Sequence, residues 1–129
     1  MRLLAREQVT VLNQTPSAFY QLAGAGAGAR EAGWDLALRW VVFGGEALDV
    51  GRLREWYAAH RGGGPVLVNM YGITETTVHV TYRPVSAADL DAGSVIGKPI
   101  PDLQIHLLDS DRQPVAAGEP CLLYTSRCV

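Results

Sequence analysis

The sequence has few cysteines and no long hydrophobic run, and these shortages exclude several classes of protein. Two cysteines occur in the 129 residues, Cys121 and Cys128. Two are too few for a disulfide framework, and their spacing matches no metal site. No apolar run approaches the roughly 20 residues that a membrane-spanning helix needs, and residues 1–7 lack the apolar core of a signal peptide. We therefore expect a cytoplasmic protein with no membrane partner.

The chain also lacks an excess of basic residues. Its 11 Lys and Arg are outnumbered by 13 Asp and Glu, so the formal net charge is -2. Domains that bind nucleic acid normally show a basic patch, so no nucleic-acid partner is expected. With 48% hydrophobic residues, the chain can bury a core, and its length is that of one domain.

Three short apolar runs predict strands of a parallel sheet. They are Val9–Leu12, Leu38–Phe43 and Val66–Tyr71. The first run is followed by Thr15 and Pro16, which can begin a helix, and the second by Asp49, which can cap another. Strands that alternate with helices form βαβ units and a parallel sheet. The predicted fold class is therefore α/β.

The run Gly24–Ala29 alternates glycine and alanine. It has little side-chain area to bury and much backbone entropy to lose on folding. We predict a flexible surface loop at this position.

The second half of the chain has a different pattern. Val78–Tyr82 is predicted to be extended, Pro84–Gly93 to be a polar connection, and Leu103–Leu108 to be a half-buried strand before a hairpin turn at Asp109–Arg112. These elements predict the start of an antiparallel β subdomain. The expected division places residues 1–83 in the α/β part and residues 84–120 in the β part.

The third predicted strand ends in a loop with the residue types of a nucleotide site, Tyr71-Gly72-Ile73-Thr74-Glu75. Gly72 permits a sharp turn, because glycine tolerates a positive φ. Thr74 and Glu75 then lie beyond the carboxyl end of the strand, where open α/β sheets bind ligands. An aromatic ring can stack on a base, a hydroxyl can reach a phosphate, and a carboxylate can bind Mg²⁺. The same residues are compatible with an ordinary strand-to-helix loop in which Thr74 is the N-cap.

The wider sequence around this loop resembles the adenylation domains of nonribosomal peptide synthetases, within the adenylate-forming, AMP-binding superfamily. Asn69–Thr77 is similar to the pattern N-x-Y-G-x-T-E-T-T, and Val42–Leu48 to a preceding G-G-E-A-L turn. Val9–Phe19 and Gly97–Ile100 also match family segments. The resemblance covers residues 1–120 and implies the parallel βαβ portion of the family's N-terminal core, followed by the start of its antiparallel β subdomain.

The resemblance implies that the full-length enzyme uses ATP and Mg²⁺ to convert an amino acid into an aminoacyl adenylate and pyrophosphate. The acyl group would then pass to phosphopantetheine on a peptidyl carrier domain, with condensation domains of the parent synthetase as further partners. Tyr71 would stack on adenine, Asn69 would bond its amino edge, and Thr74 and Glu75 would be catalytic, with Thr74 on phosphate and Glu75 on Mg²⁺. The nucleotide-binding residues implied are Gly45, Glu46, Ala47, Asn69, Met70, Tyr71, Gly72 and Thr74.

The family also recognises its amino acid at scattered positions. They fall here on Asn13, Val42, Gly44, Met70, Val78 and His79, a set that resembles that of threonine-activating domains. Asn13 and His79 can bond a side-chain hydroxyl, and such a pocket rejects an isostere without it by roughly 10⁴–10⁵, so valine should compete poorly. Val78 and His79 are adjacent, and a regular strand would point them to opposite faces. Either the backbone is irregular there or one residue contributes through its backbone.

The sequence departs from the family pattern after Pro120. We expect residues 121–129 to be a non-native tail, and assign no function to Cys121 and Cys128. The family's phosphate loop and the aspartate that pairs with the substrate amine lie upstream of the matched segments. The ribose-binding aspartate, the hinge and the catalytic lysine lie downstream. We therefore expect the chain alone to be inactive, and its exposed strand edges to favour aggregation.

Two alternative functions remain open at this point. An acyl-CoA or aryl-acid ligase of the same superfamily shares the Y-G-x-T-E loop, although polar Asn13 and His79 and the T-E-T-T continuation favour a peptide synthetase. A non-catalytic α/β binding module would show no affinity for a nucleotide.

Overall fold

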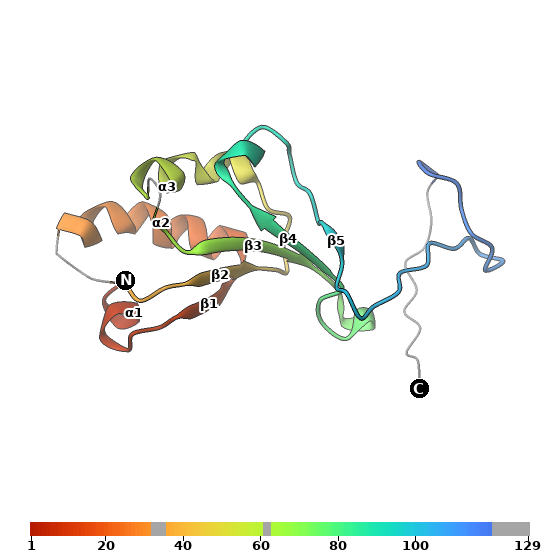
Figure 1. The fold of residues 1–129 in the computed structure, drawn as a ribbon, viewed down its shortest axis with the longest axis horizontal. Helices are drawn as coiled ribbons and strands as arrows, with labels where there is room; N and C mark the ends of the chain where they lie inside the picture. The colour runs from red at the N-terminus through yellow and green to blue at the C-terminus, as the bar shows by residue number, and fades with distance from the viewer. Residues whose placement is uncertain (32–35, 61–62, 120–129) are drawn as a thin grey trace.

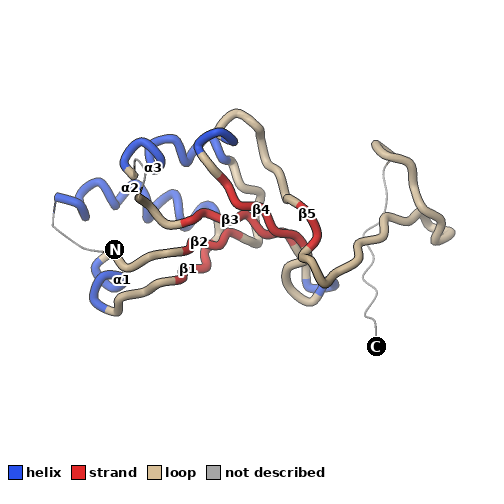
Figure 2. The backbone as a smooth tube through the Cα atoms, viewed as in Figure 1, coloured by secondary structure: helices blue, strands red, loops and turns tan. Residues whose placement is uncertain are grey.

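The described part of the computed structural model, residues 1–31, 36–60 and 63–119, contains a five-stranded sheet with the order β1-β2-β3-β4-β5 (Figures 1 and 2). The strands are β1 (Val11–Gln14), β2 (Trp40–Phe43), β3 (Val66–Tyr71), β4 (Thr81–Val85) and β5 (Lys98–Pro99). The first three pair in parallel, and β4 and β5 continue the sheet antiparallel. The predicted α/β class, with a parallel portion followed by antiparallel structure, is confirmed.

The helices α2 and α3, which connect the parallel strands, lie on one side of the sheet (Figure 1). The helices and 3-10 turns are α1 (Arg2–Arg6), α2 (Pro16–Glu31), η1 (Val50–Leu53), α3 (Arg54–Ala59), η2 (Thr74–Thr76) and η3 (Ala87–Asp89). None of the helices in the described ranges has the length and hydropathy that crossing a membrane requires.

The starts of the two connecting helices have the caps that the sequence predicts. The Thr15 hydroxyl accepts a hydrogen bond from the Ala18 amide at 3.4 Å, and Pro16 is the first residue of α2. The Asp49 carboxylate accepts one from the Gly51 amide at 3.1 Å, at the start of η1. Each cap satisfies a backbone N–H that has no partner within its helix, and so fixes where the helix begins.

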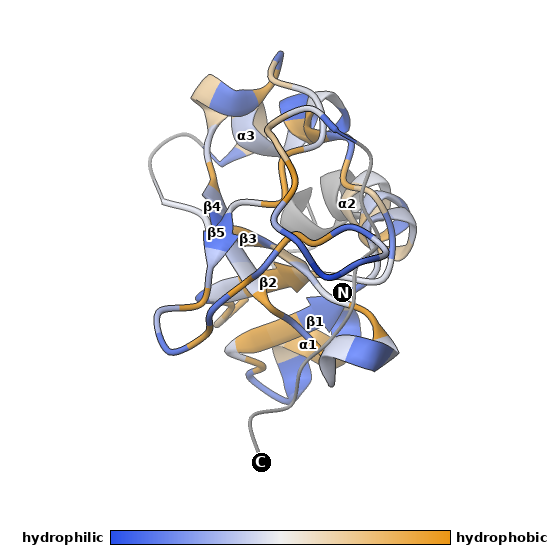
Figure 3. Cartoon of the chain, turned by 90° about the vertical axis from the view of Figure 1, so that its right-hand side faces the viewer, coloured by the Kyte–Doolittle hydropathy of each residue, from blue (hydrophilic) through white to orange (hydrophobic). Residues whose placement is uncertain are grey.

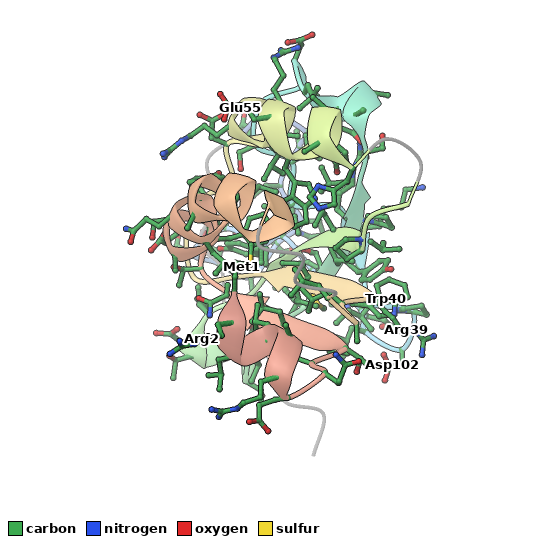
Figure 4. All side chains as sticks on the ribbon, turned by 90° about the vertical axis from the view of Figure 1, so that its left-hand side faces the viewer. Met1, Arg2, Arg39, Trp40, Glu55 and Asp102 are labelled. Atoms are coloured by element: carbon green, nitrogen blue, oxygen red, sulfur yellow. The ribbon has the colours of Figure 1, made fainter. Side chains whose placement is uncertain are left out.

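The hydrophobic core lies between the helices and one face of the sheet. Phe19 of α2 is fully buried and packs edge-to-face on Phe43 at 5.0 Å and on Trp56 at 4.9 Å between ring centroids. Val41 belongs to the same cluster. Because side chains alternate along a strand, Trp40 lies on the other face of β2 and points away from α2 (Figure 4). Figure 3 shows that β2 is mainly hydrophobic.

The predicted loop at Gly24–Ala29 is wrong, since α2 runs from Pro16 to Glu31 through these residues. Each glycine costs about 1 kcal/mol relative to alanine in a helix, but alanine is the best helix former. A helix already capped at Thr15 and packed through Phe19 needs only to propagate, which is easier than nucleation.

The strand limits also differ from prediction at two places. β1 is Val11–Gln14, two residues later than the apolar run, and so includes Asn13. β4 includes Pro84 and Val85, which were expected in a polar connection. In the part of the chain that the structure describes, β5 pairs with Thr81 and Tyr82, and no strand pairs with β4 beyond them on that side. Pro84 is tolerated at such an edge, where its missing N–H breaks no ladder hydrogen bond.

The predicted strand at Leu103–Leu108 is also wrong. Within residues 1–31, 36–60 and 63–119, only Leu108 of this segment forms a bridge, with Pro114, and Leu107 is 51% exposed. The segment extends away from the five-stranded sheet (Figure 1) and does not pair with its strands. The hairpin turn at Asp109–Arg112 is confirmed, since the Asp109 carboxylate accepts hydrogen bonds from the amides of Asp111 and Gln113. The division at residue 83 stays a prediction, and the tail with Cys121 and Cys128 lies outside the described residues.

Candidate functional site

Three loops meet at the carboxyl edge of the parallel strands. β1 leads into Thr15, β2 into the turn Gly44–Ala47, and β3 into the loop Gly72–Val80. Register brings these ends together, since Gln14 pairs with Phe43 and Phe43 with Asn69. The loop after β3 lies at the end of the sheet (Figure 1). This is the edge at which open α/β sheets bind ligands.

The turn after β2 is fixed by a glycine and by a contact with α2. Gly45 has φ +84°, a conformation that glycine adopts without a steric penalty. The Glu46 carboxylate accepts hydrogen bonds from the Ser17 hydroxyl at 2.9 Å and the Ser17 amide at 3.1 Å. These bonds, the hydroxyl first, lower the pKa of Glu46. The Glu46 side chain is thus hydrogen-bonded to the start of α2. The turn itself is formed by Gly45, the backbone of Glu46 and exposed Ala47.

We expect the Glu46–Ser17 contact to make stability depend on pH. The folded pKa of Glu46 is lowered from the ordinary 4.5. The contribution of this contact to folding stability is therefore fully present above the ordinary pKa. It is lost as the pH falls through the lowered pKa of the folded state. Urea unfolding should show a larger loss of stability between about pH 6 and pH 3 for the wild-type chain than for Glu46→Gln. Glu119→Gln, at an exposed position, is the control, and parallel curves for wild type and Glu46→Gln would contradict the prediction.

The end of β3 provides an amide with a defined orientation. Asn69 is 3% exposed, and its Nδ2 donates to the Val95 carbonyl at 2.9 Å. That bond assigns the donor end of the amide and leaves Oδ1 as the acceptor, which is the end that an adenine amino group needs. Tyr71 is half-buried, and its carbonyl accepts a hydrogen bond from the Val80 amide at 2.7 Å.

Thr74 and Glu75 are both exposed on η2. The residue that caps η2 is Ile73, so the alternative interpretation of Thr74 as an N-cap is wrong. The described residues include no group of three or more side chains that could form a metal site. A single exposed carboxylate fits Mg²⁺, which is commonly bound through one or two carboxylates together with substrate phosphates and water.

Gly72 is needed for a reason that differs from the prediction. The φ angle of Gly72 is not positive, so glycine is not required here for a left-handed turn. A Cβ at this position would lie 1.7 Å from the Val78 carbonyl oxygen and 2.6 Å from the His79 Cα. The loop therefore closes on itself at Gly72, and only a residue without a side chain allows the approach.

Residues that were predicted to bind the substrate amino acid come together on the sheet face opposite α2 and α3. Asn13 and Val42 are register partners, and Val42 alternates with Val41 and Phe43 of the core. Met70, half-buried, lies two residues beyond the Val68 that pairs with Val42, and so lies on the same face.

His79 closes this group from the loop after β3. A Cβ on Gly44 would lie 2.6 Å from the His79 Nε2, so the imidazole lies directly against the turn after β2. Val78 has a different position, because it is 61% exposed and only its carbonyl approaches Gly72. The backbone next to this pair is irregular, with φ +74° at Thr77. The contribution of Val78 to the pocket through its backbone stays a prediction.

Sequence reasoning missed two residues of this site. Thr76 bonds its hydroxyl to the backbone of Ile73, and Ser17 bonds Glu46. Ser17 follows a recognisable cap and first helical residue, but nothing in the sequence links it to a carboxylate 29 positions away.

The chain is similar to known proteins in both sequence and fold. A sequence model described as AMP-binding enzyme matches residues 1–128. The dimodular nonribosomal peptide synthase of Bacillus subtilis (strain 168) is 54% identical over 128 residues, 98% of this chain. Syringomycin synthase SyrB1 of Pseudomonas syringae pv. syringae is 49% identical over 123 residues, 94% of this chain.

Solved structures show the same fold. PA1221, described as an NRPS protein containing adenylation and PCP domains, matches 89% of this chain at 28% identity with a TM-score of 0.70. This chain spans only 5% of the Bacillus protein, 20% of SyrB1 and 22% of the PA1221 chain.

Proposed function

Since the chain belongs to the AMP-binding enzyme family, we propose that it forms part of an amino-acid-activating adenylation domain of a nonribosomal peptide synthetase. Within that domain it supplies one wall of the ATP site and part of the amino-acid pocket. The observation that supports this most is the contact of His79 with Gly44. It joins the turn that would line the adenine slot to the loop that contains Thr74 and Glu75.

The chain's own residues would bind and orient the nucleotide. Tyr71 would stack on adenine, and the Asn69 Oδ1 would accept from its amino group, with Nδ2 bonded to Val95. Gly45 and the backbone of Glu46 and Ala47 would form the opposite side of the slot. Thr74 would bind a phosphate oxygen and Glu75 would bind Mg²⁺, which supplies charge neutralisation of the phosphates when bound. The role of these residues is positioning for attack of the substrate carboxylate on the α-phosphate.

Threonine is the substrate that we propose for the pocket. Asn13, Val42, Gly44, Met70 and His79 share one side of the sheet edge, while Val78 contributes its backbone. The imidazole of His79 and the amide of Asn13 provide hydrogen-bonding groups for a hydroxyl, and Val42 and Met70 provide apolar contacts for a methyl group. A pocket with such polar groups disfavours valine, which would leave them unpaired.

The carrier partner is inferred by analogy with PA1221, which contains adenylation and PCP domains in one chain. We propose that the acyl group passes from the adenylate to phosphopantetheine on a peptidyl carrier domain, in the cytoplasm. Condensation domains of the same synthetase are proposed as further partners. Residues 1–83 and 84–120 are proposed to belong to successive subdomains.

The alternative of an acyl-CoA or aryl-acid ligase is not favoured, because the Bacillus subtilis relative described above is a nonribosomal peptide synthase and PA1221 is an NRPS protein. A binding module without catalysis predicts no affinity for ATP. We define a graft in which residues 1–119 replace the matching segment of SyrB1, with unmodified SyrB1 as the control. We expect a fluorescent ATP analogue to bind SyrB1 and the graft with similar affinity, and absence of binding to the graft alone would refute the proposed nucleotide site. The 129-residue chain alone should catalyse no threonine-dependent exchange of pyrophosphate into ATP.

A further inference from the structure

The hydroxyl of Thr76 lies at the centre of the loop between β3 and β4. It accepts a hydrogen bond from the Ile73 amide at 2.8 Å. It also lies 2.8 Å from the Ile73 carbonyl oxygen and 3.4 Å from the Val78 carbonyl oxygen. One side chain thus contacts the backbone on both sides of η2, from the residue before Thr74 to the residue before His79.

A hydroxyl has a single proton, so it donates to one of these two carbonyls at a time. The Ile73 carbonyl is the closer acceptor, and the Val78 carbonyl is at the limit of hydrogen-bond distance. The Val78 carbonyl is also the group that packs on Gly72. Thr76 therefore contacts both ends of the segment where the loop closes on itself.

The next residue is held in an unfavourable conformation. Thr77 has φ +74° and ψ -59°, values of the rare and strained γ-turn. For a β-branched residue a positive φ is an outlier that the surrounding structure must impose. Among the described residues, the contacts that impose it include those of Thr76 on one side and the packing of Val78 and His79 on the other.

We propose that Thr76 is a positioning residue that sets the distance between the pair Thr74–Glu75 and the residue His79. Through it, the parts of the loop that face the phosphates and the amino acid move as one unit. This proposal rests on the proposed function of the site. Thr76 need not touch either substrate, because its effect is transmitted through the backbone of Ile73 and Val78.

The first test uses amide hydrogen exchange, measured by NMR on the 129-residue chain. Thr76→Val keeps the shape of the side chain but leaves the Ile73 amide without its acceptor, so exchange at Ile73 should accelerate about tenfold. Thr76→Ser keeps the hydroxyl and should retain protection. Thr10→Val removes an exposed hydroxyl that makes no hydrogen bond among the described residues, and should leave Ile73 unchanged. Unchanged protection of Ile73 in Thr76→Val would overturn the proposal.

The second test uses the SyrB1 graft and the exchange of pyrophosphate into ATP. Thr76→Val should raise the KM for ATP and the KM for the amino acid together, each by about tenfold, with recovery in Thr76→Ser. A variant that is merely less stable would lose kcat and keep both KM values. Unchanged KM values, or a change in only one of them, would overturn the coupling. An unmodified graft without activity would instead contradict the proposed function, and the exchange at Ile73 would still decide whether Thr76 sets the loop.

Discussion

Gly72→Ala is expected to destabilise the chain by about 3 kcal/mol or more, because the added methyl group meets backbone that cannot rotate away. Its Cβ would lie 1.7 Å from the Val78 carbonyl oxygen and 2.6 Å from the His79 Cα. The loop must open to relieve this overlap, which moves Thr74 and Glu75 relative to the pocket. A displacement of that kind costs roughly 10² in rate when catalysis depends on position.

Two measurements check this expectation. Urea unfolding of the 129-residue chain gives the change in stability, and pyrophosphate exchange by the SyrB1 graft gives the change in rate. Gly63→Ala is the matched control, since a Cβ there meets no atom of the described residues within 4 Å. Equal stability and equal activity for the two variants would show that the loop does not close on Gly72.

Gly44→Ala is expected to have the opposite profile, with little change in stability and a large change in the use of threonine. Its Cβ would meet the Nε2 of His79 at 2.6 Å, and an imidazole can swing away where a backbone cannot. The displaced ring would no longer bond the substrate hydroxyl. An unpaired polar group costs about 1–3 kcal/mol, which corresponds to a rise of about 5- to 150-fold in the KM for threonine. The KM for ATP should stay unchanged.

The clash with His79 can be isolated by a double-mutant cycle in the graft. Gly44→Ala should raise the KM for threonine strongly in the wild-type background and only slightly in a His79→Ala background, where the ring is absent. Additive effects of the two substitutions would mean that Gly44 and His79 act independently, and would contradict the contact.

The parts of the fold that the sequence predicted well are those set by local chemistry. β3 spans Val66–Tyr71 as expected, because a mostly apolar run between Pro65 and Gly72 defines a buried strand. The starts of α2 and η1 follow from side-chain caps at Thr15 and Asp49, which act within a few residues.

The errors arose where the outcome depends on distant neighbours. Gly24–Ala29 is helical because α2 begins upstream, at Pro16, and continues through it. The composition of Gly24–Ala29 alone does not indicate this. Leu103–Leu108 alternates like a strand, but a strand needs a partner, and only Leu108 has one in the described part of the chain.

In the candidate site, too, local features could be predicted from the sequence and contacts between distant segments could not. The end of β3 and the turn after β2 could be placed at one sheet edge, because parallel strands share a carboxyl edge. The contacts between segments could not be predicted. Glu46 bonds Ser17 across 29 residues, and His79 packs on Gly44 across 35 positions (79 - 44 = 35). Gly72 was identified correctly as essential to the loop, but its close approach to Val78 depends on the path of the returning chain.

We propose above all that this chain contributes to a pocket that recognises the hydroxyl of an amino acid next to a nucleotide site. The most direct measurement is pyrophosphate exchange into ATP by the SyrB1 graft, with threonine and with valine as alternative substrates. The two differ by a hydroxyl in place of a methyl group, so the ratio of their kcat/KM values reports the bonds of Asn13 and His79. We expect a preference for threonine of roughly 10⁴-fold. Equal use of the two amino acids by an active graft would contradict it.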